Sequence, residues 1–376
     1  MSTQTLEKSK TFENYWPPLV GAGFPNPKIA VCMSGGVDSS VSTYLISKKG
    51  YETVGLTGWL IKGSGRCCDN GMVDAAKVCE QIGLNHISKD LRVFFKQEIV
   101  DPFINSYQTG YTPIPCITCN TTIKWGSLMR YAFDELNCTH IATGHYAKHL
   151  KDKEDFKIVR PKDSKKDQTF MLWGLTQEVL SRTVFPLGDL TKEEVRKIAR
   201  EGNLIVADKE ESQDICFVSD KEGTQGFLGK YLESKEGYII ENKTGKILGI
   251  HQGTHNYTIG QRKGMGIAHS EPLYVVELDI DNNIVYAGTK EELEGYELIA
   301  KDVNWILPTV ACSNTPVRMM AKIRYNSRTY LAKVQMLGNN QVKVVFNETQ
   351  SAITPGQACV FYDETDQILL GGGWII

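Results

Sequence analysis

The stretch 28–40, KIAVCMSGGVDSS, decides the fold. Its first half, Lys28–Met33, is a short apolar run of the kind that forms a buried strand. Two glycines follow at once, and Val41, Tyr44 and Leu45 then mark one face of a helix. A buried strand that turns through glycines into a helix is typical of a parallel α/β sheet.

The same alternation of strands and helices continues to about residue 220. Thr53–Ile61 and His140–Tyr146 have the pattern of strands, and Asp74–Ile82 has the pattern of a helix. Thr191 and Glu194 form a capping-box pattern, which predicts the start of a further helix. This order predicts a parallel sheet with helices packed against it.

Beyond about residue 235 the helical periodicity fades and turn residues become frequent. The segments with strand character are Tyr274–Asp279, Ile284–Ala287, Val317–Arg324, Thr329–Met336, Gln341–Phe346 and Ile368–Ile376. The first two flank residues 280–283 and predict a hairpin. Together these segments predict an all-β region, either a sandwich or a barrel.

Composition narrows the class of protein. The chain has 376 residues, enough for two or three domains, and its hydrophobic fraction of 41% excludes a disordered chain. A net charge of −2 excludes a uniformly basic nucleic-acid binder but not a local basic patch. No apolar run is long enough for a membrane span or a signal peptide, so we expect a cytoplasmic protein without membrane contact. Its ten cysteines are then mostly reduced thiols.

The loop Ser34–Ser39 is a candidate phosphate site. Its glycines allow backbone N–H groups to approach a ligand, and the start of the following helix adds unpaired donors and partial positive charge. Asp38 is suited to hold Mg²⁺ or to orient the loop, because a carboxylate does not bind phosphate directly. The lysine of a Walker A motif is missing, and the glycines do not follow the dinucleotide pattern.

This loop resembles the SGGxDS loop of the PP-loop ATP pyrophosphatases. In that superfamily the loop holds the pyrophosphate end of ATP, which is split into AMP and pyrophosphate. Its members adenylate a carbonyl or carboxylate oxygen and then displace AMP with nitrogen or sulfur. The resemblance implies ATP and Mg²⁺ as cofactors.

The cysteines offer a second chemistry. Cys116 and Cys119 form a C-x-x-C that we place in an exposed loop, because prolines precede it. A structural zinc would need a second ligand pair, and none has suitable spacing. Cys67 and Cys68 have no assigned role, and buried thiols account for Cys32, Cys79, Cys138, Cys312 and Cys359.

Seven motifs occur in one order: SGGVDSS, TPIPCITCN, ATGHY, KDQ, ICF, GQRKGMGI and TPGQ. Their set resembles the tRNA-specific 2-thiouridylases, which convert the wobble uridine of tRNA to 2-thiouridine, and it spans residues 28–376. The resemblance implies a PP-loop α/β domain at 28–220, a small central β domain at 221–290 and a tRNA-contacting C-terminal β-barrel at 291–376, after an N-terminal extension at 1–27.

The resemblance also implies roles for individual residues. Cys119 matches the nucleophile, and Cys216 matches the cysteine that carries a persulfide. The ATP-binding positions are Cys32, Met33, Ser34, Gly35, Gly36, Val37, Asp38, Ser39 and Gly144. The tRNA-binding positions are Ile114, Pro115, Cys116, His145, Lys166, Asp167, Gln168, Arg324, Tyr325 and Gln357.

Plainer interpretations stay open for several of these. His145 has the features of a packed core histidine, and Gln357 those of a turn residue. The run 148–166 has eight Lys or Arg residues and four acidic residues, so it is either a solvated loop or a segment that binds the phosphates of RNA. Arg324 and Tyr325 are either a strand pair or an RNA-stacking pair.

Three positions depart from the family pattern. Ile114 replaces an asparagine, Gln213-Asp214 replaces Thr-Gly, and Cys116 stands where many members have Asp. Cys116, Cys119 and Cys216 would supply three thiolates for a [4Fe–4S] cluster. The alternative is a persulfide on Cys216 with Cys116 as a bystander, and we favour this route.

The expected function is ATP-dependent sulfur transfer to C2 of a tRNA wobble uridine. The expected partners are tRNA, with Lys, Glu and Gln acceptors in the family, and a protein that donates sulfur, either a cysteine desulfurase or a sulfur relay. The rival functions are an amidotransferase-like PP-loop ligase, which would not need the cysteines, and a non-catalytic tRNA-binding protein.

Overall fold

The computed structural model describes residues 26–62, 69–211, 215–219, 221–308, 310 and 315–376. The features predicted from sequence that lie outside the described residues are almost all of the N-terminal extension, Cys67, Cys68, Gln213-Asp214 and Cys312.

The first unit is built on a five-stranded sheet of order β3-β2-β1-β4-β7, in which every neighbouring pair is parallel. Its strands are β1 (Lys28–Cys32), β2 (Glu52–Trp59), β3 (Asn85–Asp90), β4 (His140–Thr143) and β7 (Thr183–Val184). Ile29, Ala30 and Val31 are fully buried, as expected for a strand covered on both faces. The predicted parallel α/β sheet is confirmed.

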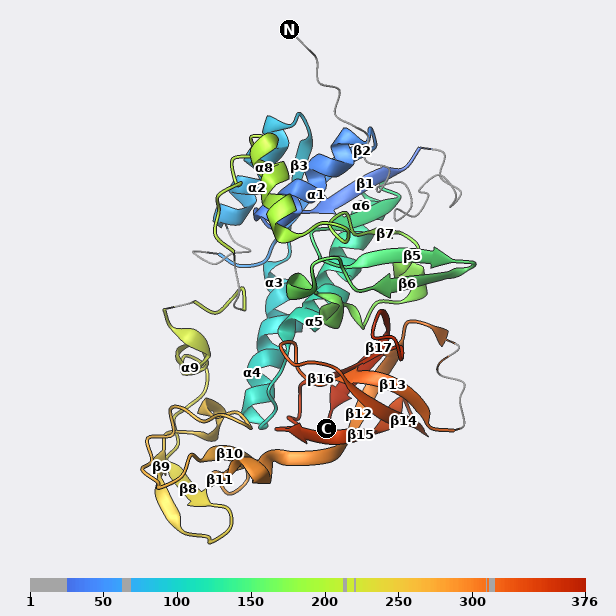
Figure 1. Cartoon of the computed structure of the whole chain (residues 1–376). Coiled ribbons are helices and arrows are strands. Elements are labelled where there is room, and N and C mark those ends of the chain that lie inside the picture. Colours follow the sequence, from blue (N-terminus) through green and yellow to red (C-terminus); the bar gives the residue numbers. More distant parts are fainter. Residues whose placement is uncertain (1–25, 63–68, 212–214, 220, 309, 311–314) are drawn as a thin grey trace.

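Helices cover this sheet (Figure 1). The helices that pack together through one apolar cluster are α1 (Val37–Lys48), α2 (Asp69–Gln81) and α8 (Lys192–Glu201). The capping box predicted for α8 is present: Thr191 Oγ1 accepts from the Glu194 N–H, and the Glu194 carboxylate accepts from the Thr191 N–H. The short helices are α7 (Gln177–Leu180) and α9 (Gly223–Leu228).

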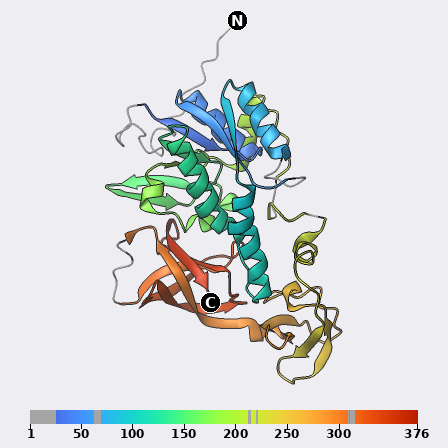
Figure 2. The same cartoon turned by 180° about the vertical axis from the view of Figure 1, so that it is seen from behind.

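Two long helices, absent from the sequence prediction, run from this sheet toward the other units (Figure 2). One joins α3 (Arg92–Phe95), η2 (Lys96–Val100) and α4 (Asp101–Gln108); the other joins α5 (Pro115–Cys119), η3 (Asn120–Leu128) and α6 (Met129–Asp134). Both contain a π-helical segment, η2 and η3, and such segments are rare and frequent at functional sites.

The C-x-x-C therefore lies on a helix, and its predicted placement in a loop is wrong. Pro115 occupies the first turn of α5, where the missing proline N–H has no partner to lose and its fixed φ suits the helix. The prolines begin this helix rather than prevent it.

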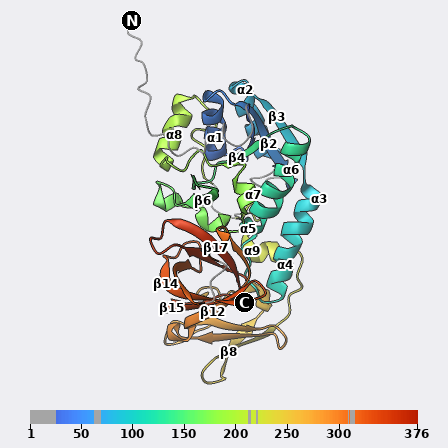
Figure 3. The ribbon, with the colours of Figure 1, turned by 90° about the vertical axis from the view of Figure 1, so that its right-hand side faces the viewer.

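The central unit is a small sheet of order β10-β11-β8-β9. Its strands are β8 (Gly237–Glu241), β9 (Ile247–His251), β10 (Tyr274–Asp279) and β11 (Ile284–Gly288). β10 and β11 are antiparallel and form the predicted hairpin. Figure 3 shows this sheet beside the barrel, at the end of the molecule away from the parallel sheet.

The C-terminal unit is a closed six-stranded barrel, because β12 pairs with both β15 and β17. Its strands are β12 (Glu294–Trp305), β13 (Val317–Lys322), β14 (Tyr330–Gly338), β15 (Gln341–Ser351), β16 (Ala358–Tyr362) and β17 (Ile368–Ile375). The barrel option of the all-β prediction is confirmed. A hairpin from the first unit, β5 (Lys148–Asp152) and β6 (Asp155–Val159), adds to the edge of β17.

None of the helices in the described part of the chain is long and apolar enough to cross a membrane.

Candidate functional site: a phosphate loop beside two cysteines

The loop between β1 and α1 has the geometry of a phosphate cradle. Gly35 adopts a φ of 72°, and a Cβ at this position would lie 2.1 Å from the Gly71 carbonyl oxygen. Ser39 Oγ accepts from the Ser34 N–H at 3.2 Å, which closes the loop. No side chain caps the start of α1, so its first-turn N–H groups can receive an anion.

Asp38 orients this loop. Its carboxylate accepts a hydrogen bond from Tyr146 Oη at 2.8 Å and pairs with Lys192 Nζ at 2.6 Å. Lys192 also pairs with Glu211 at 2.8 Å, and Glu211 pairs with Lys166. Burial, and then the charge of Asp38, raise the pKa of Tyr146, so its hydroxyl stays protonated as the donor. Of the two roles predicted for Asp38, the orienting one matches these contacts.

Gly144 lies against the loop, as its predicted ATP-binding role requires. It directly follows β4, in which Thr143 pairs in register with Cys32 of β1. A Cβ on Gly144 would lie 2.7 Å from Ser39 N and 2.8 Å from the Asp38 carbonyl carbon. The ATP-binding positions predicted from sequence thus meet at the carboxyl edge of β1 and β4.

His145 is buried beside this edge, with 8% of its surface exposed. Its Nδ1 lies 2.8 Å from Thr143 Oγ1, its Nε2 lies 3.4 Å from Lys124 Nζ, and its ring packs 5.4 Å from Trp125. Burial, and then the Lys124 charge, lower the pKa of His145 well below its usual value. The imidazole is therefore neutral, and its packing agrees with the interpretation as a core histidine.

Cys119 and Cys216 pack against the same apolar cluster, and both are partly buried. Cys119 ends α5. Cys216 is followed by Phe217, whose ring lies 5.1 Å from Phe103 and 5.9 Å from Phe95. Cys116 is exposed. The fold thus brings the two predicted catalytic cysteines to one core from distant parts of the chain.

The other described cysteines behave as structural thiols. Burial raises the pKa of Cys32 to about 12, and the nearby Lys124 charge opposes this only in part. Burial also raises the pKa of Cys79 and Cys138 to about 11. Such thiols do not form thiolates at neutral pH, so they do not compete with Cys119 or Cys216 as nucleophiles.

Within the described residues, no group of three or more His, Cys, Asp or Glu side chains is arranged to hold a metal ion. Cys116, Cys119 and Cys216 thus do not form a single-ion site of this kind.

The barrel positions predicted to bind tRNA lie beside the segment that leads into α5. Gln357 Nε2 donates to the Thr112 carbonyl at 2.7 Å, and the Thr112 N–H donates to the Pro355 carbonyl at 2.9 Å. Arg324 donates to the Ala352 carbonyl, and burial lowers the pKa of Arg324. These contacts bring the first unit and the barrel together next to Ile114, Pro115 and Cys116.

Tyr325 belongs to the same group. Its ring packs against Phe170 at 6.0 Å, and burial, followed by the charges of Asp167 and Cys116, raises its pKa. The aromatic ring therefore lies close to the C-x-x-C, where a base could stack.

The three residues of the KDQ motif have partners within the protein. Lys166 pairs with Glu211, and Asp167 pairs with Arg160. Gln168 Oε1 accepts from the Tyr146 N–H at 2.9 Å. These contacts fix the motif between the phosphate loop and the β5–β6 hairpin.

The basic run 148–166 is a hairpin and its following loop rather than a simple solvated loop. The members that form ion pairs with carboxylates are Lys148, Lys157, Arg160, Lys162 and Lys166. Much of its net charge is thus neutralised within the protein, which weakens its capacity to bind phosphates.

Lys124, Tyr146, Lys192 and Glu211 were not identified from sequence. Tyr146 lies within ATGHY, but nothing in that motif shows that its hydroxyl reaches Asp38. Lys124 lies five positions after Cys119, a spacing that carries a signal only once the segment is known to be helical.

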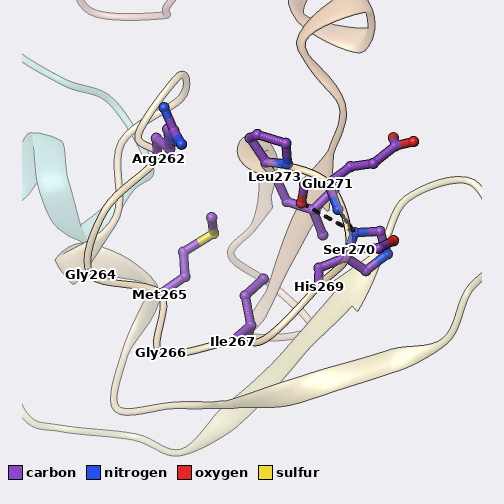
Figure 4. Close-up of a pocket in the computed structure, with 10 residues that line it drawn as sticks. Arg262, Gly264, Met265, Gly266, Ile267, His269, Ser270, Glu271 and Leu273 are labelled. Atoms are coloured by element: carbon purple, nitrogen blue, oxygen red, sulfur yellow. Dashed lines mark hydrogen bonds between the residues drawn. The ribbon is translucent and has the colours of Figure 1, made fainter.

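A cavity of about 390 Å³ lies elsewhere, within the 262–273 loop of the central unit. Figure 4 shows Arg262 and Met265 on one side of this loop and His269 and Glu271 on the other, with the Glu271 N–H donating to His269 Nδ1 at 3.2 Å. It contains none of the predicted catalytic, ATP-binding or tRNA-binding residues.

The parallel sheet and its glycine–serine loop define the class: an α/β protein of the PP-loop ATP pyrophosphatases. Three family models match the chain in succession: "tRNA methyl transferase HUP domain" over residues 27–220, "tRNA methyl transferase PRC-barrel domain" over 225–289 and "Aminomethyltransferase beta-barrel domain" over 296–375.

Full-length relatives narrow the class to a family. The tRNA-specific 2-thiouridylase MnmA of Nostoc punctiforme is 47% identical over 93% of this chain and 98% of its own length. That of Rippkaea orientalis is 47% identical over 93% of this chain and 99% of its own. This chain belongs to the tRNA-specific 2-thiouridylase family.

Among solved structures, the U34-tRNA thiolase NcsA from Methanococcus maripaludis with its [4Fe–4S] cluster matches 52% of this chain and 61% of its own, with 21% identity and a TM-score of 0.34. A similarity at this level carries no argument about the cofactor of this chain.

Proposed function

We propose that this protein is a tRNA-uridine 2-sulfurtransferase, which uses ATP to replace the C2 oxygen of the wobble uridine in tRNA by sulfur. Membership of the 2-thiouridylase family supports the formation of 2-thiouridine in tRNA. The observation that carries the mechanism is the placement of Cys119 on the helix that continues to Lys124, next to the edge that bears the phosphate loop.

In the first step, ATP is the substrate of the loop Ser34–Ser39. The uridine C2 oxygen attacks the α-phosphorus, the bond to the β-phosphate oxygen breaks, and pyrophosphate leaves. The first-turn N–H groups of α1 stabilise the charge on the departing pyrophosphate. A base held in a duplex stack cannot reach this site, so the uridine is flipped out toward Pro115 and His145.

In the second step, Cys216 carries sulfur as a persulfide that a donor protein supplied. The terminal sulfur attacks C2, the C2–O bond breaks and AMP leaves. The Cys119 thiolate then attacks Cys216 Sγ, the sulfur–sulfur bond of the persulfide breaks, and sulfur remains on C2. Cys119 and Cys216 end as a disulfide, which a thiol reductant reduces.

Mg²⁺ is proposed as the companion of ATP, where it would neutralise phosphate charge. Asp38 is the carboxylate within the loop Ser34–Ser39. It would bind Mg²⁺ if its ion pair with Lys192 opened. The alternative of a [4Fe–4S] cluster on Cys116, Cys119 and Cys216 is less favoured, because Cys116 is exposed whereas Cys119 and Cys216 pack against one apolar cluster.

The predicted domain boundaries, the ATP-binding and tRNA-binding residues, the cysteine desulfurase or relay donor and the cytoplasmic location are parts of the same proposal. The enzyme acts on tRNA, and we propose that Tyr325, Gln357 and the 114–116 segment face the target base, because Gln357 bonds to Thr112 and Tyr325 lies near Cys116.

The test is to incubate the protein with unmodified tRNA, ATP, Mg²⁺ and a sulfur source, and to analyse the digested tRNA by mass spectrometry. We expect 2-thiouridine that depends on ATP and is lost in Cys119→Ser and Cys216→Ser. Cys138→Ser is the matched control, because burial keeps that thiol protonated. AMP without any thionucleoside would instead favour another PP-loop ligase, and neither product would favour a tRNA-binding protein.

Iron and acid-labile sulfide, measured after anaerobic purification, distinguish the two sulfur routes. The persulfide route predicts an iron-free enzyme whose Cys116→Ala variant stays active. A stoichiometric cluster that is lost in Cys116→Ala, together with the activity, would replace the persulfide route by the cluster route.

A further inference from the structure

Lys124 reaches the reaction edge from the helix that bears the C-x-x-C. It lies on η3, and its Nζ is 2.9 Å from Asn120 Oδ1 and 3.4 Å from His145 Nε2. Its charge acts on both Cys32 and His145, so the ammonium group lies near the carboxyl ends of β1 and β4.

The position of this ammonium group is fixed by its neighbours. Asn120 is buried, and its Nδ2 donates to the Met171 carbonyl at 2.8 Å, so its Oδ1 faces Lys124 as an acceptor. Asn120 and Lys124 are four residues apart, so they lie on the same side of the helix.

Among the described residues, Lys124 differs from Lys192 and Lys209, two other lysines close to the loop, in having no acidic partner. Lys209 donates to the Gly35 carbonyl at 2.9 Å and pairs with Asp74 at 2.6 Å. Lys192 pairs with Asp38 and Glu211. In the part of the chain that the structure describes, Lys124 forms no ion pair, and its two Nζ contacts are an amide oxygen and a neutral imidazole. A cation without a counter-ion at a substrate edge is complementary to an anionic ligand.

The anion that this edge should receive follows from the reaction. The charge of Lys124 acts on Cys32, at the end of β1 that leads into the phosphate loop, and Cys119 precedes Lys124 on the same continuous helix. The α-phosphate is the part of ATP that reacts, and it must lie between the pyrophosphate and the attacking base.

We propose that Lys124 is a catalytic residue, whose ammonium group contacts the non-bridging oxygens of the α-phosphate. It stabilises the negative charge that develops there when the uridine oxygen attacks, and it stabilises AMP when the sulfur displaces it. This inference rests on the proposed function, and it assigns that reaction a residue outside the predicted catalytic, ATP-binding and tRNA-binding sets.

The experiment compares Lys124→Met, Lys124→Gln and Lys124→Arg with Lys77→Met, a control at an exposed lysine of α2. Single-turnover AMP release and 2-thiouridine formation are measured at saturating ATP, together with the KM for ATP and the thermal midpoint. Lys124→Gln removes the charge but keeps a donor for Asn120, so it separates catalysis from folding.

We expect Lys124→Met and Lys124→Gln to slow AMP release by about 100-fold or more, the usual effect of removing one electrostatic contact to a transition state. KM for ATP should change much less than the rate, and Lys124→Arg should recover part of the rate. Lys77→Met should match the wild type.

A Lys124→Gln enzyme that releases AMP at the wild-type rate would overturn the inference. If the pH midpoint for Cys119 alkylation were also raised in that variant, the lysine would act on the thiol instead of the phosphate. A wild-type enzyme that forms neither AMP nor 2-thiouridine would refute the proposed function itself, so the two failures are distinguishable.

Discussion

At the scale of single residues, Gly144 lies very close to the start of α1 at the ATP site. A Cβ would lie 2.7 Å from Ser39 N and 2.8 Å from the Asp38 carbonyl carbon, and both atoms belong to backbone that cannot turn away as a side chain can. We therefore predict that Gly144→Ala displaces the loop and weakens ATP binding by at least about tenfold, or 1.4 kcal/mol. Isothermal titration calorimetry with ATP and Mg²⁺ measures this.

The control for Gly144→Ala is Gly229→Ala, at the end of α9, where the nearest atom to a Cβ is 3.4 Å away. This change should leave ATP affinity unaltered. Equal affinity in Gly144→Ala and the wild type would show that the loop tolerates displacement, and Gly144 would then not contribute to the nucleotide site.

Buried histidines predict how stability depends on pH. Burial lowers the pKa of His140 and His149 to about 4, and that of His145 well below its usual value. The unfolded chain binds protons at these sites below about pH 6.5, whereas the folded chain does not. Stability is therefore full above about pH 6.5 and falls as the pH drops toward 4, by up to about 1.4 kcal/mol per pH unit for each histidine.

Replacement of one histidine tests this dependence. His149→Gln should flatten the loss of stability between neutral pH and about pH 5, because it removes one of the buried histidines whose pKa the fold lowers. Urea denaturation at the two pH values gives the free energies of unfolding. An unchanged slope in His149→Gln would mean that His149 is not kept neutral by the fold.

Sequence predicted the residues that belong to motifs better than those that act through the fold. The loop and the cysteines lie in recognisable motifs. The structure places Gly144 against the loop and packs Cys119 and Cys216 against one apolar cluster. Lys124 and Lys192 stand in ordinary helical sequence. Their roles arise only from tertiary contacts with His145 and Asp38, which no local pattern encodes.

At the scale of secondary-structure elements, the helix α8 illustrates a local signal that worked. The capping box at its start was predicted and is present, because both partners lie within one turn of the chain. The helix α5 illustrates the opposite case. The same prolines that break helices also begin them, and here Pro115 lies in the first turn of α5 while Ile117 is buried in the core.

The cap of α8 gives a prediction for this element. Thr191→Ala removes the acceptor for the Glu194 N–H at the helix start and should lower the free energy of unfolding by about 1 kcal/mol. Urea denaturation measures the change. Ser181→Ala is the control, because its hydroxyl only donates to the exposed end of a short helix, and it should change stability by less than about 0.5 kcal/mol.

A Thr191→Ala variant as stable as the wild type would mean that α8 is held by its packing alone. Packing could hold the helix without its cap, because Val195 and Ala199 are fully buried against α1 and α2. The cap matters beyond stability, since the next residue is Lys192, which holds Asp38.

At the scale of the whole molecule, the parallel-sheet unit and the barrel share a sheet. The β5–β6 hairpin pairs with β17, and Asn304 of β12 donates to the Trp173 and Leu175 carbonyls at 2.7 and 3.0 Å. Sequence predicted both units but not this connection, because strands so distant in the chain leave no shared periodic pattern. The connection holds Tyr325 and Gln357 beside the C-x-x-C.

Because the two units share this interface, we predict that they unfold as one. Asn304→Ala leaves the carbonyls of Trp173 and Leu175, both buried residues, without their donor, at a cost of about 1–3 kcal/mol. Scanning calorimetry should show one transition for both units, shifted to lower temperature. Asn242→Ala, which removes only an exposed bond to Glu292, is the control. Two transitions, with only the barrel shifted, would mean that the units are merely in contact, and the tRNA-facing barrel residues would then not be fixed relative to Cys119.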